Sequence, residues 1–557
     1  MPRFALRAAF ALALMLPSLA LAGDAEKKKA DADRILSAGR EESRVMDHLD
    51  HLTNRIGSRL TSSDALTNAC EWSVERFKSF GIENARIEKW GEFPVGFNRG
   101  PSSGRMVEPE VKGLTFGTNS WTAGTKGVVK GKAVLAPVDA EGLAKVKGDL
   151  AGAWVMIPAG AMFRFGNATK SDFQKSLDAA YDEAKIAGFV RSTRGDLILT
   201  GGNHRIDFDK LPDRASINLR KDDFDDITKR IKDDKGVVLE FDVRNYFKKG
   251  PIPLYNVIAD IPGTEFPDEY VIVGGHIDSW DGATGTCDNG TGCATTLEAA
   301  RILMKSGVKP RRTIRFMLWS GEEQGLLGSQ AYVRAHPEIL PKVSAVLVHD
   351  GGTNYLSGIM ATKAMKKDMD EAMAAVVGLD DKMPFAVREA AALPRGIGSD
   401  HDTFLYANVP GFFWNQAGKA NYTRIHHTQY DTYDGAVPEY QKHSALVVAL
   451  GAYGVASLDN KLSREAMFAA AAAPAATNRR LLGIQLDDLK VVEVMEGGIG
   501  AKSGVKVGDV LVKVGDKTVA TPQEFTAELQ KGDPAKKITI KRDDKEIELP
   551  VTFPAKP

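Results

Sequence analysis

Cysteine is scarce in this chain, with only Cys70, Cys287 and Cys293 among 557 residues. Three cysteines do not make a disulfide framework, and an odd number leaves at least one thiol free. Cys287 and Cys293 could pair with each other, although small buried apolar side chains are the expected role of all three. A fold that depends on disulfides is therefore excluded.

An excess of charge of either sign is also absent. Lys plus Arg and Asp plus Glu number 73 each, so the formal net charge is zero. This balance gives no support for nucleic acid or an anionic membrane as the main partner. Hydrophobic residues make up 43% and charged residues 26%, which is ordinary for a globular protein. At this length we expect two to four domains.

Long apolar runs are missing after the first residues, so no membrane span is expected there. The beginning of the chain carries Arg3 and Arg7, then an apolar run over 8–21, and then Ala20-Leu21-Ala22, which fits the small-x-small cleavage rule. Residues 1–22 are therefore predicted to be a signal peptide rather than a buried helix or an anchor. The mature protein is expected to be exported, either to the periplasm or by full secretion.

The rest of the chain divides by sequence pattern. Residues 33–110 show mainly helical periodicity, whereas residues 111–248 are rich in Gly, Val and Lys and predict an inserted β-rich domain. Residues 249–462 alternate short apolar runs with helical segments, which is typical of an α/β fold whose sheet is covered by helices on both faces. An Ala-rich linker, 463–479, precedes a second β-rich unit at 480–555.

Acidic and histidine residues recur just after the predicted strands of the α/β part. They are His276 with Asp278, Asp288, Glu322 with Glu323, Asp350, and His426 with His427. In open α/β sheets ligands bind outside the carboxyl ends of the strands, so we expect these clusters to meet in one site. Any one of them alone would be read as a structural histidine, a helix cap or a solvated turn. Five clusters in this order are hard to explain by chance.

The types of residue suit metal chemistry. Two histidines and three carboxylates, without cysteine, match two zinc ions with nitrogen and oxygen ligands, and a catalytic rather than a structural site. Asp288 has two oxygens with which to bridge two cations. His276 and Asp278 are two apart on an extended backbone, so one can bind metal while the other orients it. Adjacent Glu322 and Glu323 diverge, which favours one ligand and one proton-transfer group.

These segments resemble the M28 metallopeptidase family in order and in local sequence, over 255–440 with 35–104 as the N-terminal part. The stretches 275–281, 318–325 and 426–428 are similar to its carboxypeptidase Q subgroup. The resemblance implies an α/β/α sandwich with a mixed sheet, and an aminopeptidase or dipeptidase acting on short peptides. Carboxypeptidase specificity is the alternative. A non-catalytic peptide-binding scaffold and a glutaminyl cyclase on the same fold are the rival functions.

The resemblance also implies the metal ligands. One zinc ion would be held by His276, Asp288 and Asp350, and the second by Asp288, Glu323 and His427. His427 is preferred to His426 because it begins the family pattern His-Thr-x-x-Asp-Thr.

Four further residues receive roles from the same resemblance. Glu322 would be the general base and acid, and Asp278 would orient His276. His426 and Asp400 would face the substrate.

Two other regions resemble known modules. Residues 111–248 resemble the protease-associated domain found inserted in that family. Residues 480–555 resemble a PDZ domain, with Leu482-Gly483-Ile484 as its carboxylate-binding loop. PDZ domains capture chain termini by strand addition. The expected partners are therefore short peptide substrates and protein C-termini, without nucleic acid, and a homodimer is left open.

Overall fold

The computed structural model describes residues 26–158, 171–468, 482–487, 489–494, 498–531 and 533–553. The predicted signal peptide and most of the predicted linker lie outside these ranges. The chain forms two compact units, the first ending at Met467 and the second beginning at Phe468. Among the helices of the described ranges, none has both the length and the apolarity needed to cross a bilayer.

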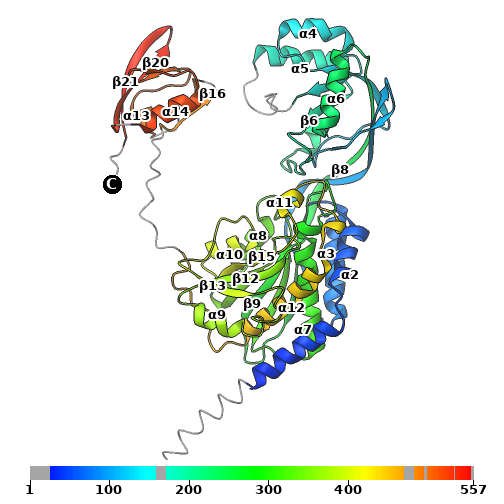
Figure 1. Ribbon diagram of the computed structural model, residues 1–557, viewed down its shortest axis with the longest axis vertical. Helices are drawn as coiled ribbons and strands as arrows, with labels where there is room; N and C mark the ends of the chain where they lie inside the picture. The colour runs from blue at the N-terminus through cyan, green and yellow to red at the C-terminus, as the bar shows by residue number, and fades with distance from the viewer. Residues whose placement is uncertain are drawn as a thin grey trace, which may run out of the picture. The chain divides into compact units, whose positions relative to one another are not determined.

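The first unit is built on a 12-stranded mixed sheet (Figure 1). Five of its strands are neighbours in the order β14 (Gly411–Phe413), β11 (Val343–Val348), β9 (Phe266–His276), β10 (Arg312–Trp319) and β8 (Val238–Ile261). β9 pairs in parallel with both β10 and β11, and β11 pairs in parallel with β14, whereas β8 runs antiparallel to β10. The predicted α/β fold with a mixed sheet is confirmed.

Helices cover this sheet, and its central strands are buried. Every residue of β10 is buried, as expected for a strand packed on both faces. On one face of β10, Phe316 contacts Phe77 of a covering helix. On the other face, Trp319 packs with Tyr332 and Phe404, which belong to two further helices. The helices are 26–41, α2 (Val45–Asp50), α3 (Asp64–Ser79), α7 (Thr291–Ser306), α8 (Leu327–Ala335), α9 (Lys366–Ala372), α10 (Asp400–Tyr406), α11 (Tyr422–Ile425) and α12 (Pro438–Ala456).

A small sheet and two short strands complete this part. The three-stranded sheet has the order β13 (Ala386–Ala390), β12 (Tyr355–Thr362), β15 (Asn415–Ala417). The short strands are β2 (Lys112–Gly113) and β3 (Phe116–Gly117).

A long antiparallel ribbon joins the two halves of the large sheet. β1 (Arg86–Glu108) pairs with β8 from Arg86 opposite Ile258 to Glu108 opposite Val238. The predicted insert, 111–248, thus begins after β1 and ends inside β8. Beyond the ribbon, β8 also pairs with β4 (Val129–Leu135), so the sheet continues without a break.

The insert contains helices as well as strands. β4 continues in parallel to β5 (Trp154–Ile157), β6 (Gly188–Ser192) and β7 (Ala215–Leu219), and the helices are α4 (Ala140–Val146), α5 (Asp172–Ala184) and α6 (Lys221–Lys232). Its core includes Trp154, Ile217, Phe224 and Phe241, all buried. Along β7, buried residues alternate with partly exposed ones, so the strand packs into this core with one face.

The described part of the second unit has a six-stranded sheet and two helices. The strands follow the order β16 (Ile484–Asp487), β17 (Lys490–Val494), β18 (Val510–Val514), β20 (Ala535–Arg542) and β21 (Lys545–Thr552), with β19 (Lys517–Thr518) on β18. The helices are α13 (Ile499–Lys502) and α14 (Pro522–Gln530), and Thr521 caps α14 by accepting a hydrogen bond from the Glu524 amide. Phe525 of α14 packs into the core with Leu511 and Ile538.

Candidate active site

The predicted site residues lie at one edge of the large sheet. His276 is the last residue of β9, the Glu322-Glu323 pair follows β10, and Asp350 follows β11. These strands are parallel neighbours, so their carboxyl ends meet. Asp288 reaches the same place from the turn that leads into α7.

His276 faces two carboxylates. Its Nε2 lies 3.0 Å from Asp350 Oδ1 and 3.2 Å from Asp288 Oδ1, and Glu322 Oε2 is 4.0 Å away. Burial opposes protonation of the ring, but the charges of Asp350 and Glu322 outweigh it and raise the pKa of His276 well above its usual value. The imidazole is thus placed to share a cation with these acids.

His427 stands on the other side of Asp288. Its Nε2 lies 3.1 Å from Asp288 Oδ2 and 2.9 Å from Glu323 Oε2. Burial of His427 is outweighed by these two carboxylates, which raise its pKa to about 10. Burial and the charge of Asp288 together raise the pKa of Glu323 to about 8. Asp288 therefore turns one oxygen to each histidine, the arrangement expected of a bridging carboxylate.

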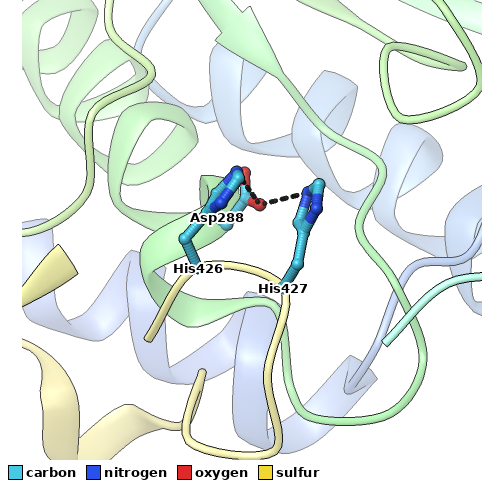
Figure 2. A group of neighbouring side chains, drawn as sticks. All are labelled: Asp288, His426 and His427. Carbon is cyan, nitrogen blue, oxygen red and sulfur yellow. Dashed lines mark ion pairs between the residues drawn. The ribbon is translucent and has the colours of Figure 1, made fainter. Parts of the chain in front are cut away.

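His426 lies close by but makes a longer approach. Figure 2 shows the imidazoles of His426 and His427 both turned toward the Asp288 carboxylate. The rings stack with centroids 3.8 Å apart, and His426 Nε2 is 3.6 Å from Asp288 Oδ2. The side chain of His426 is 44% exposed. The shorter distances from its Nε2 favour His427 over His426 as the partner of Asp288 and Glu323. His426 lies at the surface of the site.

The residues present fit divalent metal ions. Glu323 Oε1 is buried without a hydrogen-bond partner among the described residues. No Lys or Arg of the described ranges lies within ion-pair distance of the four carboxylates, which are Asp288, Glu322, Glu323 and Asp350. Buried charges need compensation, and oxygen and imidazole nitrogen donors suit divalent cations.

Glu322 is the acid best suited to hold a proton. Burial, with a further contribution from the charge of Asp350, raises its pKa well above the usual value even though His276 opposes this. A raised pKa matches the requirement of a general base and acid that works near neutral pH.

Asp278 supports both the histidine and the glutamate turn. It is fully buried and accepts hydrogen bonds from Thr61 Oγ1 at 2.9 Å and from the backbone amides of Glu322 and Glu323 at 3.2 and 3.3 Å. His276 Nδ1 lies 3.0 Å from the backbone carbonyl of Asp278 and 3.6 Å from its carboxylate. One residue therefore orients two elements of the site.

Asp400 is buried at the first residue of α10. Neither carboxylate oxygen has a hydrogen-bond partner among the described residues. Burial raises its pKa to about 7, while the charge of His276 opposes this. Asp400 thus adds a further buried acid near the cluster.

Sequence reasoning missed Arg59. This buried guanidinium donates to the backbone carbonyls of Ile277 at 2.7 Å, Thr284 at 3.1 Å and Gly285 at 2.8 Å, and it fixes the loop between His276 and Asp288. In the sequence it stands in Gly57-Ser58-Arg59, which reads only as a break between helices.

Asp431 anchors the Asp288 turn from a distant loop. Its carboxylate accepts hydrogen bonds from the amides of Cys287 at 2.6 Å and Asp288 at 3.3 Å. Cys287 and Cys293 are not bonded to each other, because all three cysteines are free and buried.

Family comparison identifies the domain that carries these residues. Residues 256–451 match the model described as peptidase family M28. This chain contains an M28 peptidase domain. The M28 match begins inside β8 and ends inside α12, so it includes all five predicted metal ligands. The predicted metallopeptidase is confirmed at this level.

The likeness to known proteins extends beyond that match. Carboxypeptidase Q from Bos taurus is 26% identical over 435 residues, and that from Rattus norvegicus is 27% identical over 438 residues; each alignment covers 76% of this chain and 88% of the relative. A solved M28 peptidase precursor from Shewanella amazonensis has a TM-score of 0.56 at 24% identity, covering 79% of this chain and 99% of that one. The last likeness supports the fold.

The second unit is confirmed as a PDZ domain, because residues 490–542 match that family's model. Leu482 is buried, Gly483 has a φ of +70°, and Ile484 begins β16. β16 ends the strand order of its sheet, so its outer edge can accept an added strand.

Proposed function

We propose that this protein is an exported di-zinc exopeptidase that hydrolyses terminal bonds of short peptides, as an aminopeptidase or a dipeptidase. The observation that carries the proposal is Asp288, whose two oxygens approach His276 and His427 beside Glu322. The ligands of one zinc would be His276, Asp288 and Asp350, and those of the other Asp288, Glu323 and His427. When bound, zinc polarises a scissile carbonyl and lowers the pKa of water.

The protein's own groups handle the proton. Glu322 takes a proton from the attacking water while the water oxygen bonds to the carbonyl carbon. The C–N bond then breaks, and Glu322 returns the proton to the leaving amine nitrogen. Asp278 holds the Glu322 backbone by accepting its N–H.

The acidic character of the site favours a free amino terminus. Glu322 and Asp400 are the carboxyl groups outside the proposed ligand sets, and their ionised forms would attract an α-ammonium group. His426, at the surface of the site, is proposed to contact the substrate with Asp400. Carboxypeptidase action is the second candidate, because the relatives aligned over most of the chain are named carboxypeptidase Q.

The remaining parts complete the proposal. Residues 1–22 would be removed on export, and residues 111–248 would form a protease-associated insert. The PDZ domain would bind protein C-termini while the peptidase domain acts on peptides.

Cleavage of blocked peptides tests the activity. Dipeptides and tripeptides would be supplied free, N-blocked or C-blocked to the zinc-loaded protein. Cleavage of C-blocked but not N-blocked peptides identifies an aminopeptidase, cleavage of free dipeptides alone a dipeptidase, and cleavage of N-blocked peptides a carboxypeptidase. No cleavage of any of them would overturn the proposal in favour of a scaffold or a cyclase.

Variants tie the activity to the site. Glu322→Gln should lower kcat by roughly 10²–10⁴-fold, the usual contribution of a general acid–base group, while zinc stays bound. Glu75→Gln, on the exposed side of α3, is the matched control and should behave as wild type. Chelation should abolish the wild-type activity, and added zinc should restore it.

A further inference from the structure

The loop that carries His427 is bound from the insert as well as from the peptidase domain. The Thr200 amide donates to the His427 carbonyl at 2.9 Å, and the Gln429 amide donates to the Ile198 carbonyl at 3.1 Å. Leu199 stands opposite Thr428 in an isolated antiparallel bridge. A strand-like segment of the insert therefore pairs with the backbone on both sides of a predicted metal ligand.

The side chain of Gln429 fastens this pairing. Its Oε1 accepts a hydrogen bond from the Ile198 amide at 2.8 Å, and its Nε2 donates to the Asp196 carbonyl at 2.9 Å. Arg424 adds an ion pair of 2.9 Å with the Asp196 carboxylate. Both ends of one amide group are thus used to join two parts of the chain that are more than 200 residues apart.

His427 has particular need of such support. Its φ is +53°, a left-handed backbone conformation that a non-glycine residue keeps only when the surroundings hold it. Its side chain is 38% exposed, unlike His276, which is buried. On the peptidase side, Asp431 ties the same loop to the turn of Asp288. The insert supplies the opposite anchor.

The insert also reaches the wall of the site. Thr200 lines a small pocket together with Trp280, Asp288, Glu323 and His427. The ring of Trp280 stands edge-on to that of His427, with centroids 6.3 Å apart. The segment that holds the His427 backbone thus also closes the space behind its ring.

We infer that the insert supports the metal centre. Its segment 196–200 positions His427, and Gln429 is the positioning residue that joins this segment to the loop of His427. This inference rests on the proposed di-zinc function. Groups that orient a metal ligand from outside the coordination sphere commonly change metal affinity by 10–100-fold when removed. The zinc ion held by His427 should therefore depend on Gln429, and the ion held by His276 and Asp350 should not.

The test is zinc release from the full-length protein. Gln429→Met keeps the length of the side chain but removes both hydrogen bonds, and Gln429→Ala removes the side chain. Gln174→Met is the matched control, since Gln174 also accepts a backbone amide, in the cap of α5 in the insert. Release into a chromogenic chelator should show two equivalents in wild type. In both Gln429 variants one equivalent should leave about tenfold faster, and the other should leave at the wild-type rate.

Two further readouts separate positioning from simple loss of fold. Hydrogen exchange should become faster at the amides of Ile198 and Gln429 in Gln429→Met, with α7 and β9 unchanged. Peptidase activity should fall at limiting zinc and return at excess zinc, because the active site refills.

The outcomes distinguish the two proposals. A wild type that binds and cleaves, with Gln429→Met losing zinc no faster than Gln174→Met, would overturn this inference alone. Faster loss of both equivalents together would also overturn it, since it assigns Gln429 to one ion. A wild type that binds no zinc would overturn the proposed function and this inference with it.

Discussion

The hydroxyl of Thr61 donates a 2.9 Å hydrogen bond to the carboxylate of Asp278, so a residue from before the matched peptidase region supports its centre. Thr61 is fully buried. The same carboxylate accepts the amides of Glu322 and Glu323. Removing the hydroxyl therefore leaves a buried charge short of one donor, beside the turn that carries the proposed acid–base group.

Thr61→Val is expected to lower kcat/KM by about tenfold, which corresponds to the ~1.5 kcal/mol contributed by a hydrogen bond to a charged group. Thr61→Ser keeps the hydroxyl and is the control. Steady-state kinetics on the cleaved peptide measure both. Equal values for the Val and Ser variants would show that Asp278 does not need this donor.

Acid stability should depend on Glu298, which lies fully buried in α7. Burial opposes its ionisation, but hydrogen bonds from Arg301 and the Arg44 amide, with the His48 imidazole 3.4 Å away, lower its pKa to about 2. Because the folded pKa lies below the ordinary 4.5, the ionised group stabilises the fold above pH 4.5. That stability is lost as the pH falls from 4.5 toward 2.

Glu298→Gln should therefore lower the free energy of unfolding at pH 7 by on the order of 3 kcal/mol, and by much less near pH 2.5. Urea unfolding of wild type and variant across this range, with chelator present throughout so that zinc loss does not contribute, measures the difference. Glu75→Gln serves as the exposed control. A difference that stays constant with pH would contradict the assignment.

All three thiols should resist a thiol reagent in the folded protein. Burial raises the pKa of Cys293 to about 12 and raises those of Cys70 and Cys287 further, so almost no thiolate is present at neutral pH. A disulfide-exchange reagent should label no thiol in buffer and three in denaturant. Only one labelled thiol in denaturant would indicate that Cys287 and Cys293 are paired.

Binding by the PDZ domain should require a free C-terminal carboxylate. A labelled peptide with a free C-terminus should bind the full-length Glu322→Gln protein, in which hydrolysis is slowed, whereas the amidated peptide should not. Gly483→Val should weaken binding by roughly tenfold, because a β-branched residue at a φ of +70° costs about 1–2 kcal/mol and distorts the loop.

Gly515→Val is the matched control for that measurement. Gly515 also has a positive φ, +59°, but lies between β18 and β19. It should affect stability and leave peptide affinity unchanged. Equal loss of binding in both variants would mean that Gly483 acts through folding alone.

The placement of three site residues could be predicted because each stands at the end of an apolar run. His276 ends β9, whereas Glu322 and Asp350 follow β10 and β11, and parallel neighbours must end at a common edge. The helical and extended periods of the chain likewise predicted the α/β fold, whereas the PDZ unit was predicted from its resemblance to that family. Local pattern suffices where the relevant geometry is set by one strand and the residues that follow it.

Other features depend on contacts between distant segments, and local pattern carries no signal for them. Arg59 satisfies carbonyls some 220 residues away, and in sequence it is an ordinary residue of a loop. Gln429 and Asp196 meet only because β1 and β8 bring the insert back to the peptidase domain. Their polar side chains would be read as solvated until the fold shows which backbone groups they satisfy.

The ribbon of β1 and β8 also decides how this protein can be shortened. Lys248 lies opposite Gly96, whereas Glu108 lies opposite Val238. Excision of 111–248 would therefore strip the far part of β1 of its partner and expose an unpaired edge that invites aggregation. Cuts must instead fall at paired positions, such as Asn98 and Tyr246, where a tight turn could close the shortened hairpin. The register of β1 against β8, and not the boundary of sequence similarity, therefore decides which residues can be removed together from this chain.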